Sequence, residues 1–194
     1  MHTEQGAILL GLARASIHAA LGGPAANPAA ADWLRERGAC FVTLTQHDRL
    51  RGCIGTLEAH RPLMEDVRAN AVAAAFHDPR FIPLTAPELP HTCIEISLLS
   101  RMEPLDFKDE SDLHAQLRPH TDGVVLRYGA QRGTFLPQVW QHLPGTRDFL
   151  RELKQKAGLP ADFWAQEIEV YRYTVRKWHE RDSLAEAGTA SGTL

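Results

Sequence analysis

The sequence has few cysteines and no long apolar run. Its three cysteines, Cys40, Cys53 and Cys93, are odd in number and widely spaced, which fits reduced thiols and excludes the disulfide framework of a small secreted domain. No apolar run is long enough to span a bilayer, and the N-terminus lacks the basic start and the apolar core of a secretory signal. We therefore predict a cytoplasmic protein that does not contact a membrane.

A strong excess of charge is also missing. The formal net charge is −3 at pH 7, whereas proteins that coat nucleic acid need clustered Lys and Arg. Residues 171–178 mix aromatic and basic side chains, as single-strand binders do, but alternation along an edge strand explains this pattern more simply. RNA binding or RNA modification is therefore a hypothesis that the charge balance supports only weakly, and it ranks third among the functions considered below.

Metal-binding and phosphate-binding motifs are absent as well. No CxxC, HxH or HExxH pattern occurs, and no glycine-rich loop has the Walker or dinucleotide spacing. The sequence therefore identifies no metal site and leaves any cofactor unknown.

Hydrophobic periodicity predicts helices alternating with short strands. Helices are expected at 4–21, 32–37, 62–76, 111–118 and 146–157, and strands at 40–45, 50–57, 91–99 and 166–178, with a second hairpin at 122–136. Gly129 and Gly133 are expected at the turn of that hairpin, and Thr146 as a helix cap. The fold class is α+β, with a mainly antiparallel sheet and packed helices, and the chain length allows one domain of two unequal lobes. Residues 1–182 form this single domain, and 183–194 are a disordered tail.

The hexapeptide LRGCIG at 50–55 places a cysteine between two glycines, two residues after an arginine. On an unbroken strand, alternation puts Arg51 and Cys53 on one face. A nearby cation stabilises the reactive thiolate, and Gly52 and Gly55 let a ligand approach the backbone. From these residues alone a small buried cysteine is the favoured interpretation, and a nucleophilic Cys53 is the alternative.

Glu95 and several histidines are candidates for moving protons. Glu95 lies on the polar face of the strand at 91–99, where it would act as a general base in a cleft or form a salt bridge with Arg51. His47, His60 and His77 are near Cys53 in sequence, but spacing does not show which histidine lies near it in space. For His77, a solvated side chain is the favoured interpretation.

Other segments occur in a characteristic order. They are LRGCIGT (50–56), AAFHDPRFIPL (74–84), IEISLLS (94–100), DGV (122–124), TFLPQVW (134–140) and FLRELKQKAGLP (149–160). Together they resemble the AMMECR family, also called AmmeMemoRadiSam system protein A, over about residues 5–180. The resemblance implies an α+β fold of two unequal lobes, with the LRGCIG strand near the cleft between them. It also implies a frequent genomic association with a Memo-like protein and a radical SAM enzyme.

The resemblance and the residue-level reasoning together define a candidate site. The hexapeptide supplies Leu50 to Gly55, the DPRF motif supplies Asp78 and Arg80, and TFLPQV supplies Gln138 as its polar residue. We predict catalytic roles for Cys53, Arg51 and Glu95, and substrate binding by Gly52, Gly55, Asp78, Arg80 and Gln138.

The family brings no settled reaction, so two main hypotheses remain. In the first, the protein is an enzyme or enzyme component of the AmmeMemoRadiSam system that uses Cys53 on a small-molecule, RNA or protein substrate. In the second, the protein is a non-catalytic adaptor that binds the Memo-like or radical SAM partner, and Cys53 is only small and buried.

Overall fold

The computed structural model describes residues 2–24 and 31–180 and divides into two compact units. The first unit comprises Met1–Leu99 and Arg176–Leu194, and the second comprises Ser100–Val175. The α+β class with antiparallel pairing is confirmed. Across the described residues, no helix is long and apolar enough to cross a membrane. The predicted tail at 183–194 lies outside the described residues.

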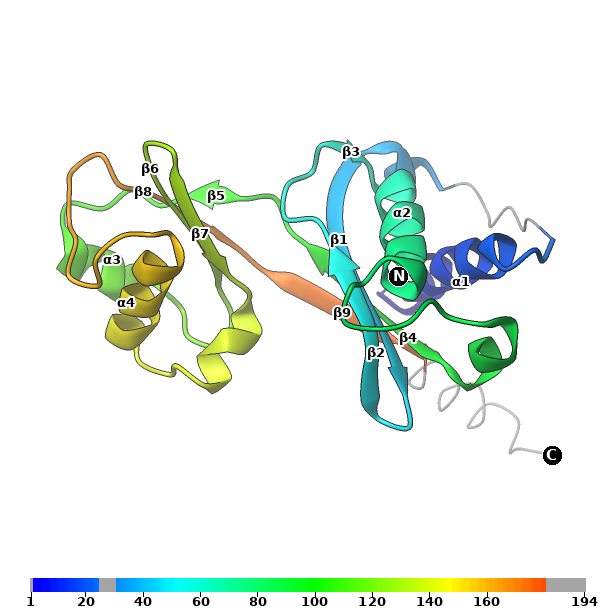
Figure 1. Cartoon of the computed structure of the whole chain (residues 1–194). Coiled ribbons are helices and arrows are strands. Elements are labelled where there is room, and N and C mark those ends of the chain that lie inside the picture. The colour runs from blue at the N-terminus through cyan, green and yellow to red at the C-terminus, as the bar shows by residue number, and fades with distance from the viewer. Residues whose placement is uncertain (1, 25–30, 181–194) are drawn as a thin grey trace, which may run out of the picture. The chain divides into compact units, whose positions relative to one another are not determined.

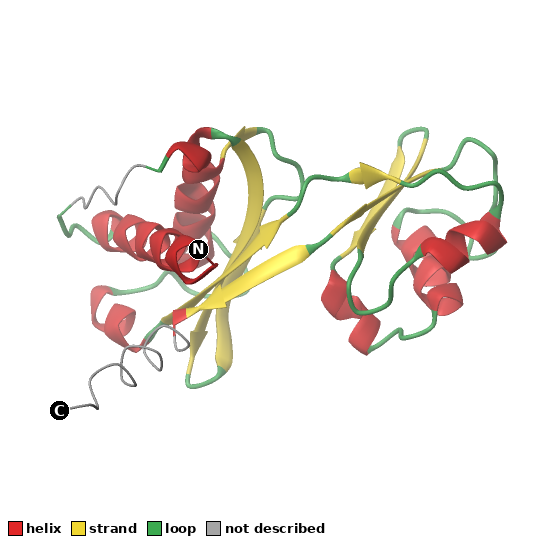
Figure 2. Ribbon diagram, turned by 180° about the vertical axis from the view of Figure 1, so that it is seen from behind, coloured by secondary structure: helices red, strands yellow, loops and turns green. Residues whose placement is uncertain are grey.

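The first unit is built on a sheet with strand order β2-β1-β4-β9, and β3 pairs with β1. Its elements are α1 (His2–Ala20), η1 (Asp32–Arg35), β1 (Arg37–Gln46), β2 (Arg49–Gly55), β3 (Arg61–Pro62), α2 (Leu63–Phe76), η2 (Ala86–His91), β4 (Cys93–Leu99) and β9 (Val175–His179). β1 pairs antiparallel with both β2 and β4. Figure 1 shows α1 and α2 beside this sheet, and Figure 2 shows it from behind.

Strand alternation separates an apolar face from a polar face. Val42, Leu44 and Ile96 are fully buried and share one core with side chains of α1 and α2. The neighbouring positions Thr43 and Glu95 are only partly buried because they point to the other face. The predicted alternation of the strand at 91–99 is thus confirmed at its centre.

The hairpin of β1 and β2 closes more tightly than the sequence suggested. His47 and Asp48 both have positive φ angles, 50° and 61°, as the two central residues of a type I′ turn do. The register then shifts: Thr45 faces Leu50, whereas Leu44 faces Gly52. The residue between them on β2, Arg51, is therefore the extra residue of a β-bulge.

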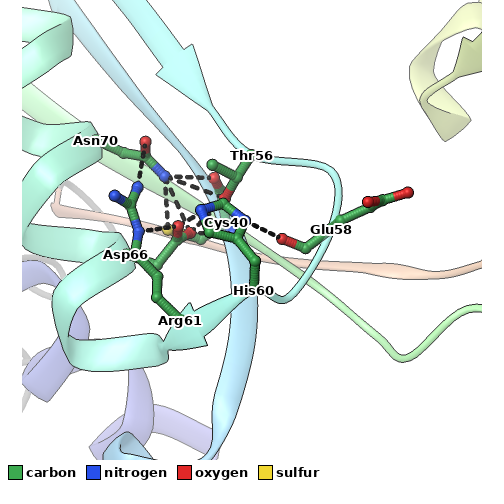
Figure 3. Close-up of polar contacts among 7 residues, drawn as sticks. All are labelled: Cys40, Thr56, Glu58, His60, Arg61, Asp66 and Asn70. Atoms are coloured by element: carbon green, nitrogen blue, oxygen red, sulfur yellow. Dashed lines mark hydrogen bonds and ion pairs between the residues drawn. The ribbon is translucent and has the colours of Figure 1, made fainter.

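A buried carboxylate ties α2 to the sheet (Figure 3). Asp66, with no exposed surface, accepts hydrogen bonds from the Cys40 N–H at 2.9 Å and from the Asn70 amide at 3.0 Å. It also accepts from the Thr56 hydroxyl at 2.6 Å and from the Arg61 Nε at 2.8 Å. Because these donors come from β1, α2, β3 and the residue after β2, one side chain connects four segments.

The second unit contains a four-stranded sheet with order β5-β8-β6-β7. Its elements are β5 (Glu103–Pro104), α3 (Glu110–Gln116), β6 (Gly123–Tyr128), β7 (Gln131–Phe135), η3 (Pro137–Gln141), α4 (Thr146–Lys156) and β8 (Glu169–Tyr173). Its core centres on Trp140 and Phe149, whose rings stack with centroids 3.6 Å apart. Burial of such rings supplies much of a small core's stability.

Three predictions about element boundaries are wrong. Gly133 lies inside β7 rather than at the turn; it is glycine there because a Cβ would come within 2.8 Å of the Leu153 carbonyl oxygen on α4. Thr146 is the first residue of α4, and Gly145 is its N-cap. The single strand predicted at 166–178 is two strands, β8 and β9, which belong to the two different sheets.

Candidate functional site

Cys53 lies in a row of polar side chains on the face of the first sheet that points away from α1 and α2. It pairs with Thr43 on β1, and Thr43 pairs with Glu95 on β4. The Cys53 Sγ is 3.3 Å from the Thr43 Oγ1, with either atom able to donate. Cys53 is partly exposed, and its side chain lies on the face of the sheet opposite α2.

The main chain of Cys53 is held by the DPRF motif. β2 is an edge strand, so half of its N–H and C=O groups have no partner strand. The Cys53 N–H donates to the Asp78 Oδ2 at 2.8 Å, and the Cys53 carbonyl accepts from the Arg80 Nη2 at 3.2 Å. Asp78 and Arg80 thereby take the place of a neighbouring strand at this residue.

Asp78 and Arg80 also bind each other. The Arg80 Nε and Nη2 donate to the two Asp78 carboxylate oxygens at 2.9 and 2.7 Å. These bonds are the largest cause that holds the pKa of the buried Asp78 carboxyl well below its usual range, with the Cys53 N–H contributing. They also raise the pKa of Arg80, and the Cys53 thiol adds to that rise. Since the Arg80 side chain is 54% exposed, it is a cation near Cys53 that a ligand can reach.

Arg51 does not share a face with Cys53, so that prediction is wrong. The bulge at Arg51 interrupts the alternation, and the guanidinium instead binds Glu88 on η2, with Nε–Oε1 at 3.3 Å. Arg51 is buried, and its Nη1 has no hydrogen-bond partner in the described part of the chain. Hydrogen bonds from the Thr85 N–H and hydroxyl, with a smaller contribution from Arg51, lower the pKa of Glu88 to about 2. The ion pair therefore anchors η2 to β2.

The two glycines of the motif are explained by packing. A Cβ at Gly52 would lie 2.1 Å from the Ala74 carbonyl oxygen of α2, and one at Gly55 would lie 2.3 Å from the Phe41 ring. Both positions thus bring other protein groups close to β2. Their predicted contact with a substrate stays a prediction.

Glu95 is one strand beyond Thr43, and it is already paired. Lys177 donates to the Glu95 Oε1 at 3.1 Å. Two strand spacings separate Glu95 from Cys53, roughly 9–10 Å, whereas direct proton transfer needs about 3 Å. Glu95 would therefore act on the thiol only through Thr43 or a water. Thr43 was not among the predicted site residues; its pairing with Cys53 in the hairpin register is the signal that identifies it.

The remaining predicted residues lie on other elements. Gln138 is exposed on η3 of the second unit, and its role stays a prediction. In the first unit, His47 is in the β1–β2 turn, His60 contacts the Glu58 carbonyl, and His77 caps the C-terminus of α2. The side-chain partner of the Cys53 sulfur is the Thr43 hydroxyl.

The remaining cysteines differ in their surroundings. Cys40 is fully buried, and burial is the main cause that raises the pKa of its thiol well above the usual range. Cys93 is partly exposed and lines a pocket of about 450 Å³ with Arg14 and Glu180. In the part of the chain that is described, no group of three or more His, Cys, Asp and Glu side chains could hold a metal ion.

Comparison with known proteins agrees with the motif order. The sequence matches the AMMECR1 family over residues 10–178. A protein from Methanothermobacter thermautotrophicus is 38% identical over 155 residues, which is 77% of this chain and 79% of that protein. Protein MJ0810 of Methanocaldococcus jannaschii is 35% identical over 159 residues, 78% of this chain and 77% of the relative.

A solved structure shows the same fold. The crystal structure of the uncharacterized protein PH0010 from Pyrococcus horikoshii superposes with a TM-score of 0.75 and is 32% identical in sequence. The match covers 91% of each chain. The family match, the relatives and the shared fold agree, and the chain belongs to the AMMECR1 family.

Proposed function

We propose that the protein is an enzyme, or an enzyme component of the AmmeMemoRadiSam system, in which Cys53 is the nucleophile or the point of covalent attachment. One observation carries this proposal: the main chain of Cys53 is held on its outer edge by Asp78 and Arg80, while the residue stays partly exposed. Held in this way, the thiol has a defined position, which nucleophilic catalysis requires.

The chemistry rests on Arg80 rather than Arg51. Arg80 binds Cys53 directly and is half exposed, whereas the guanidinium of Arg51 is buried against Glu88. A cation beside a thiol favours the thiolate, and the Thr43 hydroxyl is placed to donate a hydrogen bond to that sulfur. The same guanidinium would bind an anionic group of the substrate, because a charged donor strengthens such hydrogen bonds.

The test is the alkylation rate of each cysteine by iodoacetamide in the native protein, followed by mass spectrometry across a pH series. We expect Cys53 to react fastest of the three cysteines, because an activated nucleophile must be both accessible and nucleophilic. Cys40 is an internal control that should react only after denaturation, because it is fully buried. Protection of Cys53 until denaturation, or a rate and pH profile equal to those of Cys93, would contradict the proposal.

Arg80→Gln tests the proposed cation. It should slow the alkylation of Cys53, because it removes the cation that binds this residue. Arg49→Gln is the matched control, since Arg49 is an exposed arginine on the same strand as Cys53. An alkylation rate that is unchanged in Arg80→Gln, or changed equally in Arg49→Gln, would exclude Arg80 from this role. Cys53→Ser should abolish function in vivo.

The adaptor is the second candidate, and exposed apolar side chains near the site favour it. Ile82 is 77% exposed and Leu50 is 44% exposed, so each offers apolar surface that a partner could cover. In this function the surface binds a Memo-like protein or a radical SAM enzyme. Ile82→Asp should then weaken a pull-down of those partners, while Cys53→Ala should not; the reverse pattern would favour the enzyme.

We also propose a cytoplasmic location. The three cysteines of the described residues are free, and two of them are partly exposed. Exposed, unpaired thiols persist in reducing compartments.

A further inference from the structure

The second unit contains a polar pocket that the proposed function does not use. Its volume is about 570 Å³, within the range of small-molecule sites. The charged and polar lining residues are Glu110, Ser111 and His114 of α3, Arg147 and Arg151 of α4, and Asp162 of the following loop. All of them belong to the second unit, so the pocket is complete within it.

Two arginines without partners form one wall. Arg147 and Arg151 are four residues apart on α4, a spacing that places them on one helix face. Both residues are exposed. Neither guanidinium makes an ion pair or hydrogen bond within residues 2–24 and 31–180. Two adjacent free guanidiniums attract a doubly charged anion.

One acidic residue of the pocket is already neutralised. Lys154, which is 1% exposed, donates to the Glu110 Oε1 at 2.5 Å. Glu110 therefore does not cancel the charge of the two arginines. Asp162, on the loop, has no hydrogen-bond partner among the described residues and is free to accept from a ligand hydroxyl.

His114 lines the same wall as Ser111. Its Nε2 is 4.0 Å from the Glu110 Oε1, which is beyond hydrogen-bond distance, and its buried Nδ1 has no partner among the described residues. Burial is the main cause that lowers the pKa of His114; Glu110 opposes this shift, and Lys154 and Arg147 add to it. The neutral ring has one donor and one acceptor. Because 21% of the side chain stays exposed at the pocket, a ligand there can contact the ring.

We propose that this pocket binds a small phosphate monoester that carries hydroxyl groups. The phosphate lies against Arg147 and Arg151, and the hydroxyls contact His114, Ser111 and Asp162. A phosphate monoester has a charge of about −1.5 to −2 at pH 7 and three acceptor oxygens. A ligand with one carboxylate has a single negative charge and two acceptor oxygens, so it would neutralise only one of the two guanidiniums.

The test uses the full chain, labelled with ¹⁵N and titrated separately with glycerol 3-phosphate, inorganic phosphate and L-malate. We expect saturable shifts of amide resonances in α3 and α4 with both phosphates, with glycerol 3-phosphate binding more tightly. The absence of such shifts would overturn the proposal. Tighter binding of L-malate than of glycerol 3-phosphate would overturn the phosphate assignment.

Variants separate the pocket from general charge. Arg147→Gln combined with Arg151→Gln should weaken glycerol 3-phosphate by about tenfold or more. The matched control is Arg101→Gln, which removes an exposed arginine of the same unit outside the pocket. An unchanged affinity in the double variant, or an equal loss in the control, would overturn the proposal. His114→Asn should weaken glycerol 3-phosphate but not inorganic phosphate; equal effects on both would overturn the placement of the hydroxyls.

Discussion

Replacing Asp66 by Asn should destabilise the protein while keeping the shape of the side chain. The Asp66 Oδ2 accepts from the Cys40 N–H and the Asn70 amide, and Oδ1 accepts from Arg61. An asparagine has one oxygen and one NH₂ group. If the NH₂ replaces Oδ2, it faces two donors; if it replaces Oδ1, it faces a guanidinium. Both orientations therefore leave donors without an acceptor.

The size of the effect follows from the number of lost bonds. Each buried donor left without a partner costs about 1–3 kcal/mol. The Arg61 side chain is 28% exposed, so water compensates part of that loss. We expect a loss of about 2–4 kcal/mol in the free energy of unfolding, or roughly 5–15 °C in the thermal midpoint for a chain of this length.

The control for this prediction is Glu65→Gln. Glu65 is the neighbouring residue in the first turn of α2 and is exposed, so the substitution removes the same charge from the same helix end. We expect a change within about 0.5–1 kcal/mol. Circular dichroism measures both thermal midpoints, and hydrogen exchange should show faster exchange of the Cys40 amide in Asp66→Asn. Equal shifts of the midpoint in the two variants would refute the reasoning.

Two further predictions concern the attachment of β2. Gly52→Ala should cost about 1–3 kcal/mol or more, because its Cβ would lie 2.1 Å from the Ala74 carbonyl oxygen. A Cβ at Gly11 on α1 would meet no other atom, so Gly11→Ala should raise the free energy of unfolding by about 0.5–1 kcal/mol. Urea midpoints of the two variants that move in the same direction would contradict this contrast. The depressed pKa of Asp78 stabilises the fold above the ordinary carboxyl pKa of about 4, and this contribution is lost as the pH falls toward the depressed value. The stability difference between wild type and Asp78→Asn should therefore be largest near neutral pH and should shrink in acid, and a constant difference in urea melts would count against the Arg80 contact.

The sequence predicted the elements that depend on neighbouring residues. The hairpin of β1 and β2, the helix that begins after Pro62 and the apolar alternation of β4 all follow from patterns a few residues long. Such patterns reflect local backbone preferences and the burial of one face. The division of residues 166–178 into two strands was missed because nothing local marks Thr174 as the point where the chain changes sheets.

The candidate site could be predicted only in its composition. The sequence identified Cys53, Asp78 and Arg80, but not that the second motif binds the main chain of the first, because 25 residues and a helix separate Cys53 from Asp78. The position of Arg51 was wrong because a bulge depends on how two strands pair, and one extra residue redirects a side chain.

The bulge and the edge position of β2 together explain why the two motifs belong to one site. An edge strand needs partners for its outward N–H and C=O groups, and at Cys53 these partners are a carboxylate and a guanidinium rather than another strand. A neighbouring strand would bond the N–H and C=O of Cys53 with its own main chain and would bring no charge to this edge. Arg80 bonds the carbonyl with a charged side chain, more than half of which stays exposed. The cation that pairs the edge of β2 therefore also faces solvent beside the thiol. Arg51, turned away by the bulge, instead binds Glu88 and fixes η2, so one arginine is buried as structural support and the other stays exposed.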